Sequence, residues 1–165
     1  MIAVVKATVE DIPTIREMAH LTWPPTFRDI LSQEQIEYML EMMYSEKALK
    51  EQIEVKKHQF FLAKESEKAL GYLSVEVDYN QKPTIKIHKI YILPDLQGKG
   101  IGKLLMQKAE QVALENKNTI LSLNVNRFNQ ALKFYESLGF SITKTEDINI
   151  GNGYLMEDFV MEKNL

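Results

Sequence analysis

The sequence predicts an α/β fold in which helices cover both faces of a mixed, mostly antiparallel sheet. Short β-branched runs alternate with longer segments whose apolar residues recur at helical spacing. The alternating runs at residues 70–77 and 84–93 are separated by a polar turn, which is typical of an antiparallel pair. A glycine-rich loop at residues 97–102 then leads into an amphipathic helix, and this connection makes the next strand locally parallel.

The N-terminal third is predicted to hold one strand and three helices. Residues 2–7 form the strand, and residues 8–11 supply a capping box for the first helix. We expect this helix to end near Trp23-Pro24-Pro25, because two prolines cannot continue it. Ser32 begins a second helix through another capping box, and Ser45 caps a third.

The remainder is predicted to continue the sheet and to add two helices. The expected strands are residues 59–64, 70–77, 84–93, 119–125, 140–145 and 156–162, and the expected helices begin at Ile101 and Asn129. Gly139 follows the last helix in a C-cap position, and Gly151-Asn152-Gly153 lies in the loop between the last two strands. No repeat, linker or low-complexity tract divides the chain, so one domain over residues 1–165 is expected.

Composition narrows the classes of function. With 165 residues, 45% of them hydrophobic and 26% charged, the chain has a globular composition. It has no cysteine, which excludes disulfides, thiolate metal centres and a cysteine nucleophile. A net charge of −3 gives no field strong enough to hold nucleic acid, and no apolar run is long enough to span a membrane. We therefore expect a cytoplasmic protein with a small-molecule partner and no nucleic-acid or membrane partner.

The glycine loop, Gln97-Gly98-Lys99-Gly100-Ile101-Gly102, fits neither common nucleotide motif. The dinucleotide pattern GxGxxG fails because Lys103 occupies the last glycine position, and the Walker pattern fails because Leu104 replaces the magnesium-binding hydroxyl. The loop still places free backbone amides at a helix N-terminus, where glycines let a phosphate approach closely. Lys99 and Lys103 add positive charge, so the loop favours a phosphorylated ligand; a tight turn with solvated lysines is the alternative.

Two segments resemble one family. Tyr91-Ile92-Leu93-Pro94 followed by the glycine loop resembles the acetyl-CoA signature of the GNAT acyltransferase superfamily, with its core [Arg/Gln]-x-x-Gly-x-[Gly/Ala]. Residues 129–140 are similar to that family's helix with Asn, Ala and Tyr and to the strand after it. The resemblance implies the GNAT acyl-CoA N-acyltransferase fold and acetyl-CoA as co-substrate. The layout of residues 22–27 and 154–161 is similar to the branch that contains bacterial polyamine and spermidine acetyltransferases.

The resemblance also implies which residues bind acetyl-CoA. The backbone of Tyr91, Ile92 and Leu93 would pair with the pantetheine arm, and the N–H of Ile92 or Leu93 would polarise the thioester carbonyl. Asn129 would bond the pantetheine arm or the rest of CoA, unless it only caps its helix. Tyr135 would return a proton to the CoA thiolate, unless it is only a core aromatic. The residues expected around the pyrophosphate are Gln97, Gly98, Lys99, Gly100, Ile101, Gly102 and Lys103.

The acceptor side is less defined. His88 lies on the strand that leads to the glycine loop, where the family often has its base, but a surface histidine explains it equally well. Trp23, Phe27 and Tyr38 would wall an acceptor pocket or only hold helices together. Glu34, Glu37 and Glu41 form an acidic helix face that would steer a polycation, unless it is only a solvated surface. His20 and His58 show no metal-ligand spacing, and no metal site is expected.

The predicted function is transfer of acetyl from acetyl-CoA to a primary amine by direct attack in a ternary complex. No covalent enzyme intermediate is expected, because the chain has no cysteine to form one. A polyamine is the first acceptor considered, with an amino acid, an antibiotic amine or a protein N-terminus as alternatives. A non-catalytic acetyl-CoA sensor is the rival from another class, and homodimer formation is left open.

Overall fold

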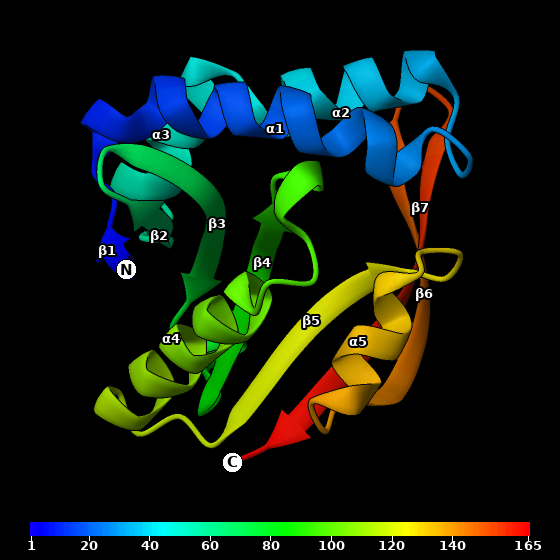
Figure 1. The fold of residues 1–165 in the computed structure, drawn as a ribbon. Coiled ribbons are helices and arrows are strands. Elements are labelled where there is room, and N and C mark those ends of the chain that lie inside the picture. Colours follow the sequence, from blue (N-terminus) through cyan, green and yellow to red (C-terminus); the bar gives the residue numbers. More distant parts are fainter.

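The computed structural model describes residues 1–165 and has one seven-stranded sheet, in the order β1-β2-β3-β4-β5-β7-β6 (Figure 1). The strands are β1 (Ile2–Lys6), β2 (Gln59–Glu65), β3 (Lys68–Glu76), β4 (Thr84–Ile92), β5 (Ile120–Asn126), β6 (Ser141–Gly151) and β7 (Tyr154–Asn164). The α-helices are α1 (Ile12–Phe27), α2 (Gln33–Tyr44), α3 (Glu46–Glu54), α4 (Ile101–Glu115) and α5 (Ala131–Ser137). All neighbouring strands are antiparallel except β4 and β5, which are parallel, so the predicted fold class is confirmed.

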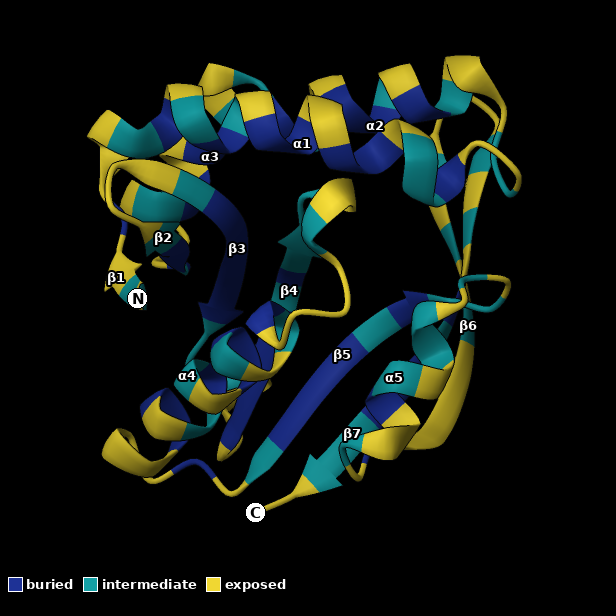
Figure 2. Cartoon of the chain, in the orientation of Figure 1, coloured by how far each residue is buried: buried dark blue, intermediate teal, exposed yellow.

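The helices bury two separate cores, one on each face of the sheet. One core joins α4 and α5 to β2, β3, β4 and β5, and the other joins α1, α2 and α3 to the opposite face of β2 and β3. Figure 2 shows β3 and β5 largely buried, while the outward sides of α1 and α2 and most of the edge strand β6 are exposed. None of the helices combines the length and the apolar content that crossing a bilayer needs.

Local capping signals are confirmed. Ser32 accepts a hydrogen bond from the Gln35 N–H at 3.1 Å, and Ser45 accepts one from the Ala48 N–H at 3.1 Å. The predicted capping box at residues 8–11 also forms, and it begins a short 3₁₀ turn that leads into α1. These bonds satisfy N–H groups that a helix start leaves without partners.

The prediction that the first helix ends near Trp23 is wrong, because α1 runs through both prolines to Phe27. Each proline removes one intrahelical donor, and the carbonyls that lose a partner belong to His20 and Leu21. Both residues are exposed, so water can hydrogen-bond to the freed oxygens. Trp23 and Phe27 are buried, and their burial stabilises the last turn.

The last two strands are longer than predicted. β6 and β7 meet at a two-residue turn, Asn152-Gly153, in place of the ten-residue loop expected between residues 145 and 156. Both turn residues have positive φ, 54° and 79°, which matches the twist of an antiparallel hairpin. Most residues of β6 are exposed, so the strand lacks the apolar alternation by which sequence reasoning finds strands.

The two central strands separate part of the way along β4. Pairing between them covers only residues Thr84–Ile87 of β4, and beyond Ile87 the strand has no partner on that side. Figure 1 shows β4 and β5 diverging toward α1 and α2. The register of β4 against β3 also shifts at this point, so that His88 has no partner in the ladder. This β-bulge turns both His88 and Lys89 away from the core under α4.

Candidate active site

A cleft of about 1390 Å³ opens where the two strands diverge. Its walls come from the glycine loop and α5 on one side and from α1, β6 and β7 on the other. Ligand sites in proteins are typically such concave regions with a few polar groups placed among apolar ones. The cleft brings together most residues of the predicted site.

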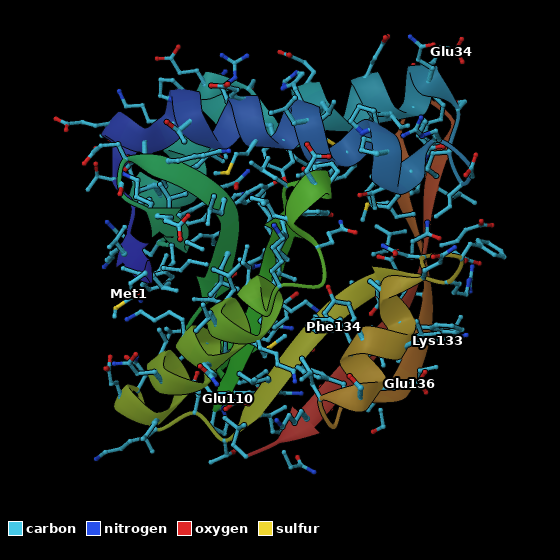
Figure 3. The ribbon with its side chains drawn as sticks, viewed as in Figure 1. Met1, Glu34, Glu110, Lys133, Phe134 and Glu136 are labelled. Atoms are coloured by element: carbon cyan, nitrogen blue, oxygen red, sulfur yellow. The ribbon has the colours of Figure 1, made fainter.

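The glycine loop forms one end of the cleft. Gly98 and Gly100 have φ of 84° and 82°, a conformation that residues with a Cβ rarely adopt. Gly100 precedes α4, and no side chain caps the first N–H groups of that helix. A Cβ on Gly102 would lie 3.0 Å from the Phe134 ring, so this glycine allows α4 to pack closely against α5. In Figure 3, Phe134 points from α5 toward α4. The uncapped amides and helix dipole suit a pyrophosphate.

The backbone N–H groups on the open edge of β4 are not all the ones that were predicted. The Leu93 N–H donates to the Leu70 carbonyl at 3.0 Å, so this amide already has a partner on β3. N–H groups alternate along a strand, so the amide of Tyr91 also faces β3 while those of Ile90 and Ile92 face the cleft. Ile92 therefore retains the predicted backbone position, whereas the amides of Tyr91 and Leu93 do not.

Tyr135 on α5 lines the cleft, although only 8% of the residue is exposed. Burial raises its pKa well above the ordinary value of 10.0, so the phenol stays protonated and can donate a proton. Asn129 lies nearby in the cleft wall, and its Oδ1 accepts a hydrogen bond from the Ala131 N–H at 2.9 Å. The helix-capping role of Asn129 is thus present, and its amide nitrogen remains for a ligand.

A cluster of two histidines and one glutamate lies at the β-bulge. His88 Nε2 is 2.9 Å from Glu76 Oε1, and His58 Nε2 is 3.2 Å from the same oxygen. The two imidazole rings stack with centroids 4.2 Å apart and planes 11° apart. Burial lowers the pKa of His88 to about 3 and that of His58 to about 4, so both rings are neutral at neutral pH.

Sequence reasoning missed this cluster. Glu76 showed no signal, and His58 was interpreted as structural, because the three residues come from β3, the start of β2 and the bulge of β4. Their ligand atoms lie within 4.8 Å of one another, as in many metal sites. The ring planes are nearly parallel, however, so the in-plane lone pairs do not converge on one point as tetrahedral zinc requires.

Part of the cleft wall is acidic. Asp158 on β7 is 3% exposed, burial raises the pKa of its carboxyl, and it accepts a hydrogen bond from Asn124 Nδ2 at 3.2 Å. Glu146 and Glu162 also line the cleft. Lys86 lies among the carboxylates, donating to Asn124 Oδ1 and resting 5.3 Å from the centre of the Tyr79 ring. These groups come from β4, β5, β6 and β7, and sequence reasoning found none of them.

The aromatic residues predicted for the acceptor pocket separate into two groups. Trp23 and Phe27 line the cleft, and their ring centroids are 4.6 Å apart. The ring of Trp23 also lies beside that of Tyr91, with centroids 5.8 Å apart. Tyr38 is not in the cleft wall, and its hydroxyl donates to the Ile150 carbonyl at 2.6 Å, joining α2 to the β6–β7 hairpin. The interpretation of Tyr38 as a pocket residue is therefore wrong.

The acidic face of α2 does not reach the cleft either. Glu34, Glu37 and Glu41 are exposed and absent from its walls. In Figure 3, Glu34 lies at the outer end of α2 and points away from the sheet. The solvated-surface interpretation describes this face, and the carboxylates that line the cleft are those of Asp29 and of Glu146, Asp158 and Glu162 on β6 and β7. Lys99 is also exposed outside the cleft, whereas Lys103 lines it.

Known proteins are similar to this chain in sequence and in fold. Residues 27–163 match the family described as the acetyltransferase (GNAT) domain, and the chain belongs to that family. A spermidine N(1)-acetyltransferase of Thermoplasma acidophilum is 29% identical over 163 residues, which cover 96% of this chain and 94% of the relative. An uncharacterized N-acetyltransferase of Lactobacillus delbrueckii subsp. lactis is 27% identical over 99% of this chain and 98% of the relative.

Solved structures agree with the sequence relatives. The PaiA N-acetyltransferase of Thermoplasma acidophilum, solved in complex with coenzyme A, aligns with a TM-score of 0.84 and 26% identity, covering 100% of this chain and 99% of the other. The protein is thus an acetyl-CoA-dependent N-acetyltransferase with the GNAT fold.

Proposed function

We propose that this acetyltransferase transfers acetyl to a primary amine of a small polycation, a polyamine, by direct attack in a ternary complex. The observation that carries the proposal is that the carboxylates of Glu146, Asp158 and Glu162 all line the cleft and all act on Lys86. The similarity to a spermidine N(1)-acetyltransferase over almost the whole chain supports the same acceptor class.

Charge favours a cation beside these carboxylates. The three carboxylates act on Lys86 from the strands beside it, and Asp158 is nearly buried, so its charge is poorly screened by water. A protonated amine of the acceptor would supply the charge that these carboxylates lack. Each such charge-assisted hydrogen bond typically contributes about 1.5–3 kcal/mol.

Acetyl-CoA would occupy the part of the cleft beside the glycine loop. Its pyrophosphate would lie on the amides of residues 98–103, and its pantetheine arm would pair with the open edge of β4. The Ile92 N–H, which faces this edge, would donate to the thioester carbonyl and stabilise the negative charge that develops there. The acceptor amine would then approach the carbonyl carbon from the acidic part of the cleft.

Two side chains would handle the protons. His88 would accept a proton from the acceptor ammonium, because an ammonium has no lone pair with which to attack. The amine nitrogen would then bond to the thioester carbon, and the bond from that carbon to sulfur would break. Tyr135, protonated and in the cleft wall, would return a proton to the CoA thiolate. The acetylated amine and CoA would leave without an enzyme-bound intermediate.

An amine panel tests the proposal. The protein is incubated with acetyl-CoA and polyamines, amino acids, aminoglycosides or N-terminal peptides, and released CoA thiol is followed; the chain has no cysteine to contribute background. We expect turnover mainly with polyamines. Turnover confined to peptides or amino acids would contradict the polyamine assignment, and saturable acetyl-CoA binding without release for any amine would favour the sensor alternative.

The variant Asp158→Asn tests the carboxylates directly. It removes one charge but keeps the shape, so KM for the polyamine should rise about 10-fold to 100-fold while KM for acetyl-CoA stays unchanged. Glu157→Gln is the matched control, because Glu157 is the exposed neighbour on the same strand. Equal effects of the two substitutions would contradict the assignment.

A further inference from the structure

We infer that Glu76 is a positioning residue for His88. Glu76 holds the His88 ring in the tautomer whose Nδ1 can take a proton from the acceptor amine, and the stacked His58 ring restricts the movement of His88. The inference rests on the proposed transfer to an amine. Glu76 and His58 do not line the cleft, so the inference gives a role in the reaction to two residues outside it.

The first step is the hydrogen bond between His88 and Glu76. His88 Nε2 lies 2.9 Å from Glu76 Oε1 with hydrogen-bonding geometry. A carboxylate can only accept, so Nε2 carries the hydrogen. In a neutral imidazole the other nitrogen is then unprotonated, which leaves Nδ1 with a lone pair.

The second step is the state of His58. Its Nδ1 is buried without any hydrogen-bond partner, while its Nε2 lies 3.2 Å from Glu76 Oε1. A buried N–H without a partner costs more than a buried lone pair, so the hydrogen of His58 belongs on Nε2 as well. One carboxylate oxygen therefore lies near both rings, in hydrogen-bonding geometry with His88 alone, and the stacked His58 ring limits rotation of His88.

The third step is access. Of the three residues only His88 lines the cleft, and 24% of its side chain is exposed, against 8% for His58. The β-bulge frees His88 from the ladder and turns it toward the acceptor face, next to the open edge of β4. Because Nε2 of His88 donates its hydrogen bond to Glu76, Nδ1 is the nitrogen that can interact with a ligand.

The proton balance needs no other reagent, because the acceptor ammonium loses two protons: one goes to His88, and the other, lost after the C–N bond forms, replaces the proton that Tyr135 gives to the CoA thiolate. The acceptor ammonium gives one proton to His88 Nδ1, directly or through one water, and the freed lone pair attacks the thioester. The imidazolium then carries hydrogens on both nitrogens, and the Glu76 carboxylate stabilises its charge. His88 releases the proton to solvent after the product leaves.

The charged surroundings keep His88 unprotonated between turnovers. Burial, Lys89, Lys86 and Lys56 lower its pKa, while the Tyr79 ring lies edge-on at 5.9 Å. The carboxylate of Glu76 opposes the three lysines from the β3 side. His88 is therefore neutral between turnovers, and it can take the acceptor's proton only while the Glu76 carboxylate stabilises the imidazolium, so the rate should rise with pH as the acceptor ammonium titrates.

The tautomer can be measured without any acceptor. In a long-range ¹H–¹⁵N spectrum of the uniformly labelled protein, His88 should show a protonated Nε2 and an unprotonated Nδ1. Glu76→Gln should shift this balance, and Glu67→Gln, at an exposed turn, should not. A protonated Nδ1 in the wild-type protein would overturn the inference, whatever amines the enzyme acetylates.

Kinetics provides the second readout. Glu76→Gln should lower kcat about 10-fold to 100-fold with little change in KM for acetyl-CoA, as expected for a group that orients a base. His88→Ala should lose more activity and regain part of it with added imidazole. Unchanged kcat in Glu76→Gln, or no rescue of His88→Ala, would overturn the inference. Inactivity of the wild-type protein with every amine would instead refute the proposed function, since the spectrum would still report the tautomer.

Discussion

The buried Lys89 provides a test of how the bulge region is held. Its residue is 7% exposed, and its Nζ donates to Gln52 Oε1 at 2.8 Å. The ammonium lies over the rings of Tyr44 and Phe60, at 5.4 and 5.6 Å from their centroids, and no carboxylate lies within ion-pair distance. Burial, reinforced by Lys56, lowers its pKa from 10.5 to about 7.

The magnitude follows from proton linkage. Because the folded pKa lies below the unfolded one, the folded protein binds fewer protons between pH 10.5 and pH 7. The contribution of Lys89 to stability is therefore complete above pH 10.5 and is lost as the pH falls to 7. At about 1.36 kcal/mol per pKa unit, the loss between pH 10 and pH 7 is about 3–4 kcal/mol.

The variant Lys89→Met removes this titration while keeping a long side chain. It also removes the hydrogen bond to Gln52, which costs about 1–3 kcal/mol at every pH. Urea unfolding from pH 7 to pH 10 should therefore show the variant gaining about 3–4 kcal/mol relative to wild type as the pH falls. Lys68→Met, at an exposed strand end, is the control. A difference between Lys89→Met and wild type that does not vary with pH would refute the reasoning.

Three further outcomes are expected. Gly100→Ala forces a Cβ into the left-handed region, which should lower the free energy of unfolding by about 1–2 kcal/mol. Because this Cβ would also hold the pyrophosphate away from the loop amides, acetyl-CoA affinity measured by calorimetry should fall roughly 10-fold, and an unchanged affinity would place the pyrophosphate elsewhere. Tyr135→Phe should lower kcat about 100-fold with thermal stability almost unchanged, since the hydroxyl is the only group removed; full activity in steady-state assays would exclude it as the acid. Burial lowers the pKa values of His58 and His88 to about 4 and about 3, so their stability contribution is complete above pH 6.5 and is lost as the pH falls. Urea unfolding should show a slope of up to about 2.7 kcal/mol per pH unit below pH 6, about half of it absent in His58→Phe, and an equal slope in both proteins would contradict this origin.

Elements specified by neighbouring residues were predictable. The caps at Ser32 and Ser45 formed as expected because each bond spans three residues. The end of α1 was predicted too early, because the burial of Trp23 and Phe27 outweighs the preference of the two prolines to end a helix. The length of the β6–β7 hairpin was underestimated, because most of β6 is exposed and carries no apolar alternation.

In the candidate site, too, the parts built from neighbouring residues were predicted and the parts built from distant residues were not. The glycine loop and the Asn129–Tyr135 segment are contiguous motifs, and the cleft contains both. The acidic wall was assigned to α2 because three glutamates share one helix face, whereas the carboxylates that line the cleft are Asp29, after α1, and Glu146, Asp158 and Glu162 of β6 and β7. No spacing along the chain links these carboxylates to Lys86, which they face across the sheet.

The sequence by itself determined the proposed acetyl-CoA end of this enzyme, because glycines, amides and a helix start within one short segment would bind a phosphate with little help from the rest of the chain. Only the tertiary structure decided the acceptor end. Strand order brings β4, β5 and β7 side by side, and a one-residue register shift sets which side chains of β4 meet Glu76. Those pairings depend on packing between residues tens of positions apart, which local propensity does not encode.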